Sequence, residues 1–173
     1  MVRVEIGPGY MPESRCKTNV CYAFRPHYLP DLDTVYLDIR PPETSYYDAS
    51  WVVGDAHNLP FRHSSISEIY VAHVIEHLDN PLEFLRECRR VLKRGGRVVV
   101  ETPNFLSRSA YLDPDHKHIF NFLSLWKLAR KAGLKPRFGS PNIGSLLPVP
   151  LKRFFKLVWL VTADTLVLVG EKP

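Results

Sequence analysis

The stretch VRVEIGPG at residues 2–9 decides the fold that this sequence predicts. Its first half alternates β-branched residues with charged ones and reads as a short strand. Its second half is a glycine and proline turn signal placed where that strand must end. We therefore expect the fold to begin with a strand that runs directly into a glycine turn.

Further short apolar runs follow this first one along the chain. They occupy residues 35–39, 51–55 and 67–73, and the first two end in an aspartate or carry one near the end. Strands that are apolar almost throughout are typical of parallel sheets covered on both faces. The pattern predicts a buried, mostly parallel sheet.

Helical spacing appears between these strands. Residues 81–94 place apolar side chains on one face, and Asn80 followed by Pro81 is a typical helix start. We expect Gly95 and Gly96 to end this helix and a fifth strand to follow at residues 97–102. A second helix is predicted at residues 123–132, closed by Gly133, and a late strand at 165–169. Alternating strands and helices predict an α/β fold with right-handed crossovers.

The whole chain has the size and composition of one soluble domain. Its 173 residues are 45% hydrophobic and 24% charged, so we predict a single domain over residues 1–173. The three cysteines, Cys16, Cys21 and Cys88, form no CxxC pair, and no secretory signal is apparent, so we expect a cytoplasmic protein. Polar residues interrupt the apolar stretch at 154–169, which predicts no integral membrane association. The net charge of +5 fits a solubilising surface better than a polyanionic partner.

Residues that suit an adenosine ligand follow the first three expected strands. Parallel sheets bind ligands beyond the carboxyl ends of their strands, where Gly7, Asp38 and Asp55 lie here. Glycine lets a ligand approach the backbone, and the two carboxylates suit ribose hydroxyls and an adenine amine. The turn lacks the third glycine of GxGxxG, so a pyrophosphate ligand, and with it a nucleotide-dependent dehydrogenase, is less well supported.

Five motifs in order make this pattern specific. They are VEIGPG at residues 4–9, LD at 37–38, GDAHNLPF at 54–61, HVIEHL at 73–78 and RVLKRGG at 90–96. Together they resemble the class I S-adenosylmethionine-dependent methyltransferases, in particular the small-molecule-type subfamily. The resemblance covers residue 2 to about residue 102. It implies a Rossmann-like three-layer sandwich with a mostly parallel seven-stranded sheet, in the strand order 3-2-1-4-5-7-6.

The resemblance also implies S-adenosylmethionine as cofactor, S-adenosylhomocysteine as product, and a set of site residues. Glu5, Gly7 and Gly9 would line the methionine side. Asp38, with Ile39 beside it, would hold the ribose, and Asp55 with Ala56 would border the adenine. Ala72 and His73 would flank the methionine and the transferring methyl.

Methyl transfer needs a base only when the acceptor arrives protonated. We predict His73 and His77 as catalytic residues, since histidine titrates near neutrality, with Glu76, His116 and His118 as further candidates. The competing interpretation is that Glu76 and His77 only cap the turn after the fourth strand.

A metal site is the alternative for the same residues. Glu76, His77 and His116 resemble ligands of the small-RNA 2′-O-methyltransferases, where two glutamates and two histidines hold a divalent ion. His73 stands where that pattern has its first glutamate, which moves the set from oxygen towards nitrogen ligands and away from magnesium. We therefore predict no metal, and keep these three residues as the alternative.

The acceptor is predicted only as a class. We expect a small molecule, or a lipid or sugar intermediate. An RNA methyltransferase with a divalent metal and a catalytically silent cofactor-binding regulatory protein are the alternatives. Because no covering helix precedes residue 2, the acceptor pocket is expected from residues 11–30, 104–117 and 139–150, completed in a homo-oligomer by a partner subunit. Residues 150–159 are expected to form a crossover helix, with a membrane-surface segment as the alternative.

Overall fold

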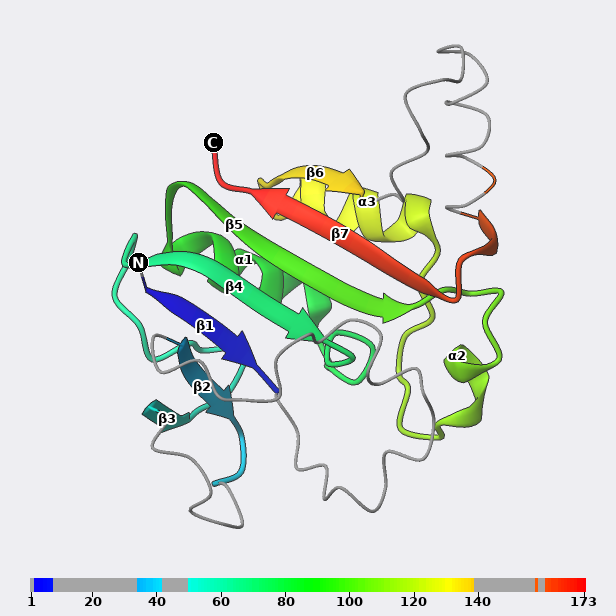
Figure 1. Cartoon of the computed structure of the whole chain (residues 1–173), viewed down its shortest axis with the longest axis horizontal. Helices are drawn as coiled ribbons and strands as arrows, with labels where there is room; N and C mark the ends of the chain where they lie inside the picture. Colours follow the sequence, from blue (N-terminus) through cyan, green and yellow to red (C-terminus); the bar gives the residue numbers. More distant parts are fainter. Residues whose placement is uncertain (1, 8–33, 42–49, 139–157, 159–160) are drawn as a thin grey trace.

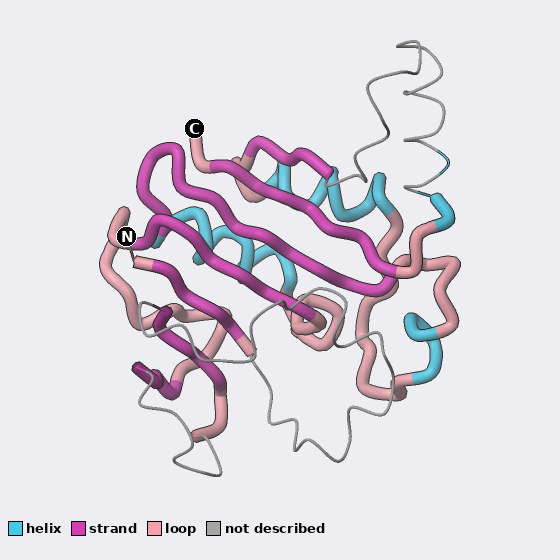
Figure 2. The backbone as a smooth tube through the Cα atoms, viewed as in Figure 1, coloured by secondary structure: helices cyan, strands magenta, loops and turns pink. Residues whose placement is uncertain are grey.

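The computed structural model describes residues 2–7, 34–41, 50–138, 158 and 161–173. These residues form one sheet of seven strands and three named helices (Figures 1 and 2). The strands are β1 (Arg3–Ile6), β2 (Thr34–Asp38), β3 (Ser50–Val53), β4 (Ile66–Ala72), β5 (Leu92–Pro103), β6 (Lys135–Phe138) and β7 (Thr165–Glu171). The helices are α1 (Pro81–Val91), α2 (Ser109–Leu112) and α3 (Phe122–Lys131).

The sheet confirms the α/β class and the predicted strand order, β3-β2-β1-β4-β5-β7-β6. The strands from β3 to β5 pair in parallel, and β7 runs antiparallel between β5 and β6. Ile6 of β1 lies in register with Leu37 of β2 and Val71 of β4, so these strands end together. The residues that follow them therefore meet at one edge of the sheet.

The core lies between the sheet and helices α1 and α3, which Figure 1 shows together behind β4, β5 and β7. Alternate residues of the strands face these helices and are buried. The helices contribute Phe84, Leu85, Leu125 and Ala129 to the core, all with no exposed surface. Burying one large apolar side chain contributes about 1.5–3 kcal/mol. Cys88 lies in the same layer, and burial raises the pKa of its thiol.

Helix α1 begins where the sequence predicts but ends earlier. The side chain of Asn80 accepts a hydrogen bond from the amide of Glu83 at 3.2 Å. The predicted end at Gly95 and Gly96 is wrong, because β5 already starts at Leu92 and includes both glycines. The amide of Gly95 donates to the carbonyl of Lys172, whose own amide donates to Gly96. Pairing with the end of the chain therefore overrides the local stop signal.

Helix α3 and strand β6 lie together near the β6 edge of the sheet. Helix α3 is confirmed, and Asn121 and Ser124 cap its start reciprocally. Strand β6 has no signal of its own in residues 135–138 and forms by pairing with β7, where Pro136 is tolerated because β6 is an edge strand. The expected loop at 104–117 contains the single turn of α2.

Several expectations fall outside the described residues. They are Gly9, the parts of the acceptor pocket at 11–30 and 139–150, and most of the crossover segment at 150–159. Within the described part of the chain, no helix is long and apolar enough to cross a membrane.

Candidate functional site

A cavity of about 310 Å³ opens at the edge where β1, β2 and β3 end. It contains five of the predicted cofactor residues, from three separate segments of the chain. Its lining consists of Ile6, Gly7, Leu37, Asp38, Ile39, Gly54, Asp55, Ala56, His57, Val74, His77, Leu78, Asp79 and Lys117. Its volume lies at the lower end of the range for small-molecule sites.

Gly7 allows the close approach on which one wall of this cavity depends. Its φ of +64° lies in the left-handed region, and its amide donates to the carbonyl of Leu37 at 2.8 Å. A Cβ placed there would lie 2.3 Å from Cγ2 of Val74. The site therefore needs glycine here for backbone conformation and for space.

Asp38 and Asp55 stand on neighbouring strand ends. The carbonyl of Asp38 accepts a hydrogen bond from Gly54 at 2.9 Å, which ties the two ends together. Oδ1 of Asp38 accepts from the amide of Arg40 at 3.2 Å. A carboxylate held by one oxygen in this way can still accept hydrogen bonds from a ligand's hydroxyls.

His57 holds the carboxylate of Asp55. Oδ1 of Asp55 accepts from the amide of His57 at 2.8 Å and lies 2.9 Å from its Nδ1. The amide of Asn80 donates to Nε2 of His57 at 3.3 Å, so Nδ1 carries the proton. The hydrogen bond from the His57 amide, followed by that from its ring, lowers the pKa of Asp55. This supporting role was not predicted, although the GDAHN motif contains both residues.

The opposite wall carries an ion pair that the sequence analysis missed. Nζ of Lys117 donates to Oδ1 of Asp79 at 2.6 Å, and this hydrogen bond lowers the pKa of Asp79. Both residues line the cavity, and Lys117 is the single lysine or arginine in the described lining. Its signal in the sequence was weak, because 38 positions separate the two partners.

Three predicted cofactor residues do not line the cavity. Glu5 and Ala72 lie in β1 and β4, and His73 follows β4 directly. His73 has a φ of +54°, and its amide donates to the carbonyl of Glu101 at 2.9 Å. Left-handed backbone at a non-glycine residue is strained and is often found at functional sites. The half-exposed imidazole of His73 therefore lies at the end of β4, next in sequence to the cavity residue Val74.

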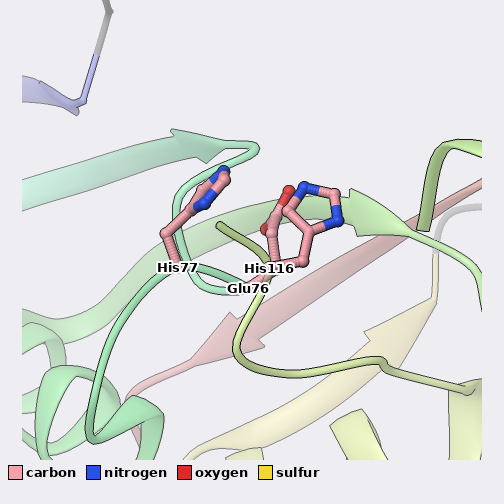
Figure 3. Close-up of side chains that lie close together, drawn as sticks. All are labelled: Glu76, His77 and His116. Atoms are coloured by element: carbon pink, nitrogen blue, oxygen red, sulfur yellow. The ribbon is translucent and has the colours of Figure 1, made fainter. Parts of the chain in front are cut away.

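A second cluster, formed by Glu76, His77 and His116, adjoins the cavity (Figure 3). One ligand atom of each residue lies within 4.8 Å of the others. Glu76 is only 1% exposed, and its Oε2 accepts a hydrogen bond from Oγ1 of Thr102 at 3.0 Å. The three alternative metal residues of the sequence analysis are thus brought together.

The two histidines of this cluster are held in one tautomer. Nδ1 of His77 lies 3.1 Å from the carbonyl of Asp115, and Nδ1 of His116 lies 3.1 Å from that of Ala110. A carbonyl only accepts hydrogen bonds, so Nδ1 donates in both rings, and in the neutral form of each ring Nε2 is the acceptor. Such a nitrogen can take a proton or bind a metal ion.

Comparison with known families adds to this geometry. A family model described as a methyltransferase domain matches residues 20–100. This range includes Asp38, Asp55 and the turn after β4, and it leaves out Gly7 and His116.

Individual relatives point in the same direction. The chain is 44% identical over 69 residues to demethylmenaquinone methyltransferase of Thermotoga maritima. This aligned region covers 40% of this chain and 30% of the relative. It is 35% identical over 86 residues to a probable S-adenosylmethionine-dependent methyltransferase of Mycolicibacterium smegmatis, covering 47% of this chain and 34% of that protein. The chain thus spans about a third of the length of these curated relatives.

A solved structure matches over the whole chain. It is an S-adenosylmethionine-dependent methyltransferase from Aquifex aeolicus, with a TM-score of 0.63 and 12% identity. The match covers 100% of this chain and 82% of the solved one. At this identity the likeness concerns the fold.

Proposed function

Because the chain belongs to the class I S-adenosylmethionine-dependent methyltransferase family, we propose that it transfers a methyl group from S-adenosylmethionine to a small-molecule acceptor. One observation carries this proposal. The cavity at the carboxyl edge of the sheet combines a glycine turn with two carboxylates on adjacent strand ends. This arrangement suits an adenosine ligand bound at the carboxyl ends of parallel strands.

The residues of the cavity fit the cofactor. Gly7 has no Cβ, and Val74 packs into the space that a Cβ would take. The backbone of Gly7 therefore forms this part of the cavity wall. Asp38 would accept hydrogen bonds from the ribose hydroxyls. Asp55, ionised and held by His57, would accept one from the adenine amine. When bound, the cofactor supplies a methyl group on a positively charged sulfur.

The protein's contribution to the transfer is mainly positioning. Displacement at a sulfonium needs the acceptor atom in line with the breaking bond and water kept away, and both follow from a shaped site. His73 and His77 remain the proposed bases for an acceptor that arrives protonated. Support for His77 is its place in the cavity lining with Nδ1 bonded to a backbone carbonyl, and support for His73 is its exposed ring beyond the end of β4.

A small molecule is favoured over RNA as the acceptor. Among the described lining residues Lys117 is the single lysine or arginine, and its charge is paired with Asp79, whereas an RNA site needs several free cations. The similarity to demethylmenaquinone methyltransferase, over 69 residues, also favours a small acceptor.

Calorimetric titration of the full chain with S-adenosylmethionine and S-adenosylhomocysteine tests the cofactor site. We expect binding by the wild type and a loss of about tenfold or more in Asp38→Ala, since a hydrogen-bonded carboxylate is worth about 1.5–3 kcal/mol. Asp164→Ala is the matched control, because Asp164 is exposed and lies outside the cavity lining. Equal affinities for both variants would remove Asp38 from the site.

Activity needs a separate measurement. Release of S-adenosylhomocysteine is followed with a panel of quinone, lipid, sugar and RNA acceptors, and we expect turnover with a small molecule. Cofactor binding without turnover on any acceptor would favour the regulatory protein instead, and turnover on RNA alone would favour the RNA methyltransferase.

A further inference from the structure

We propose that Glu76, His77 and His116 bind one divalent transition-metal ion, of which zinc suits the ligands best. The three side chains come from two loops, the turn after β4 and the segment after α2, and converge with their ligand atoms within 4.8 Å (Figure 3). Small side-chain rotations bring such atoms to the distances of a tetrahedral site.

The buried carboxylate is the first argument. Glu76 is 1% exposed, and its Oε1 has no hydrogen-bond donor among the described residues. Nδ1 of His73 lies 3.3 Å from this oxygen, within ion-pair range but without hydrogen-bond geometry. Burying a carboxylate without a full set of partners is costly. A cation bound at Oε1 removes that cost.

The orientation of the ligands is the second argument. Metal-binding histidines almost always donate their other ring N–H to a carboxylate or a backbone carbonyl, which fixes the ring. His77 and His116 both do so through Nδ1, to the carbonyls of Asp115 and Ala110. The hydroxyl of Thr102 donates to Oε2 of Glu76 and so fixes the orientation of this carboxylate. The supporting shell of a metal site is therefore already in place.

The donor atoms select the kind of ion. Two imidazoles and one carboxylate suit zinc and its neighbours in the first transition row, whereas magnesium and calcium prefer oxygen ligands throughout. Three protein ligands leave a fourth position for water or for another oxygen. Oδ2 of Asp113, an exposed carboxylate, lies 3.8 Å from Nε2 of His116.

The ion would lie at the wall of the cavity, because His77 belongs to both sites. Its open position can then bind and polarise an oxygen of the acceptor. This role rests on the proposed methyl transfer, whereas metal binding itself does not. If His77 binds the metal ion, it cannot also act as a base. His73 is then the remaining proposed base for a protonated acceptor.

Metal-stripped full-length protein titrated with Co²⁺ and then Zn²⁺ tests the site. We expect one Co²⁺ per chain with visible absorption typical of nitrogen and oxygen ligands, displaced by Zn²⁺. His77→Ala and His116→Ala should each weaken binding at least about tenfold, since loss of supporting residues alone costs about 10–100-fold. His63→Ala is the matched control, because His63 is an exposed histidine outside the cluster.

Folding and cofactor binding are followed in parallel. Zn²⁺ should raise the unfolding temperature of the wild type but not of His116→Ala. Glu76→Gln, which keeps the size of the side chain and the Thr102 contact, is a second variant should an alanine variant unfold. Asp38→Ala should keep Co²⁺ binding, and His116→Ala should keep cofactor binding, so each proposal can fail alone. Absence of stoichiometric Co²⁺ binding by the wild type, or unchanged binding in the cluster variants, overturns the metal site.

Discussion

Replacing Gly7 by alanine tests the reasoning about the glycine wall most directly. Two separate costs are expected, because Gly7 has a φ of +64° and a Cβ there would lie 2.3 Å from Cγ2 of Val74. Gly95 provides a control with only the first cost. Its φ is +72°, and a Cβ on it would meet nothing within 4 Å.

The magnitudes follow from these two environments. Left-handed backbone costs alanine about 1–2 kcal/mol, and reduced freedom of the unfolded chain returns about 0.4–1 kcal/mol at either position. Gly95→Ala should therefore destabilise by about 1 kcal/mol. Overpacking adds about 1–3 kcal/mol at Gly7, since the branched side chain of Val74 must move, so Gly7→Ala should lose about 2–4 kcal/mol.

Urea unfolding followed by far-UV circular dichroism measures both variants, with linear extrapolation to water. Gly7→Ala in a Val74→Ala background completes the cycle, and there its cost should fall to that of Gly95→Ala. Because Gly7 and Val74 both line the cavity, the single variant should also bind S-adenosylmethionine about tenfold more weakly or worse, a loss of about 1.4 kcal/mol. Equal destabilisation by Gly7→Ala and Gly95→Ala would refute the close-contact argument.

Two further predictions concern ionised carboxylates. The hydrogen bond and charge of Arg90 lower the pKa of Glu87 in the folded protein, so Glu87 stabilises the fold fully above its unfolded pKa of about 4.3. This contribution is lost as pH falls through the lower folded pKa, and urea unfolding of wild type and Glu87→Gln from pH 3 to 7 should show the difference shrink at low pH; a constant difference contradicts it. Thr102→Val removes the donor to the buried Glu76 and should cost about 1.5–3 kcal/mol in the same assay at pH 7, whereas unchanged stability would show that Glu76 does not depend on this hydrogen bond.

Much of the fold was predictable because its signals are local. The strand before Gly7, the helix start at Asn80 and Pro81, and the aspartates at the end of β2 and after β3 depend on residues close together in the chain. The strand order came from the family resemblance, and the sheet confirms it. The start of β5 was mispredicted, since Gly95 and Gly96 pair with Lys172, more than 70 positions away.

The site divides in the same way. Gly7, Asp38 and Asp55 could be assigned to a ligand because each directly follows or ends a strand of a parallel sheet, and such ends must meet. By itself, the sequence therefore predicted most of the elements and the sheet edge that we propose for the cofactor. Only the tertiary structure decided which polar contacts form there, namely Lys117 with Asp79 and His57 with Asp55. The first of these contacts joins residues 38 positions apart, and its geometry depends on how the intervening loops pack, which no local pattern encodes.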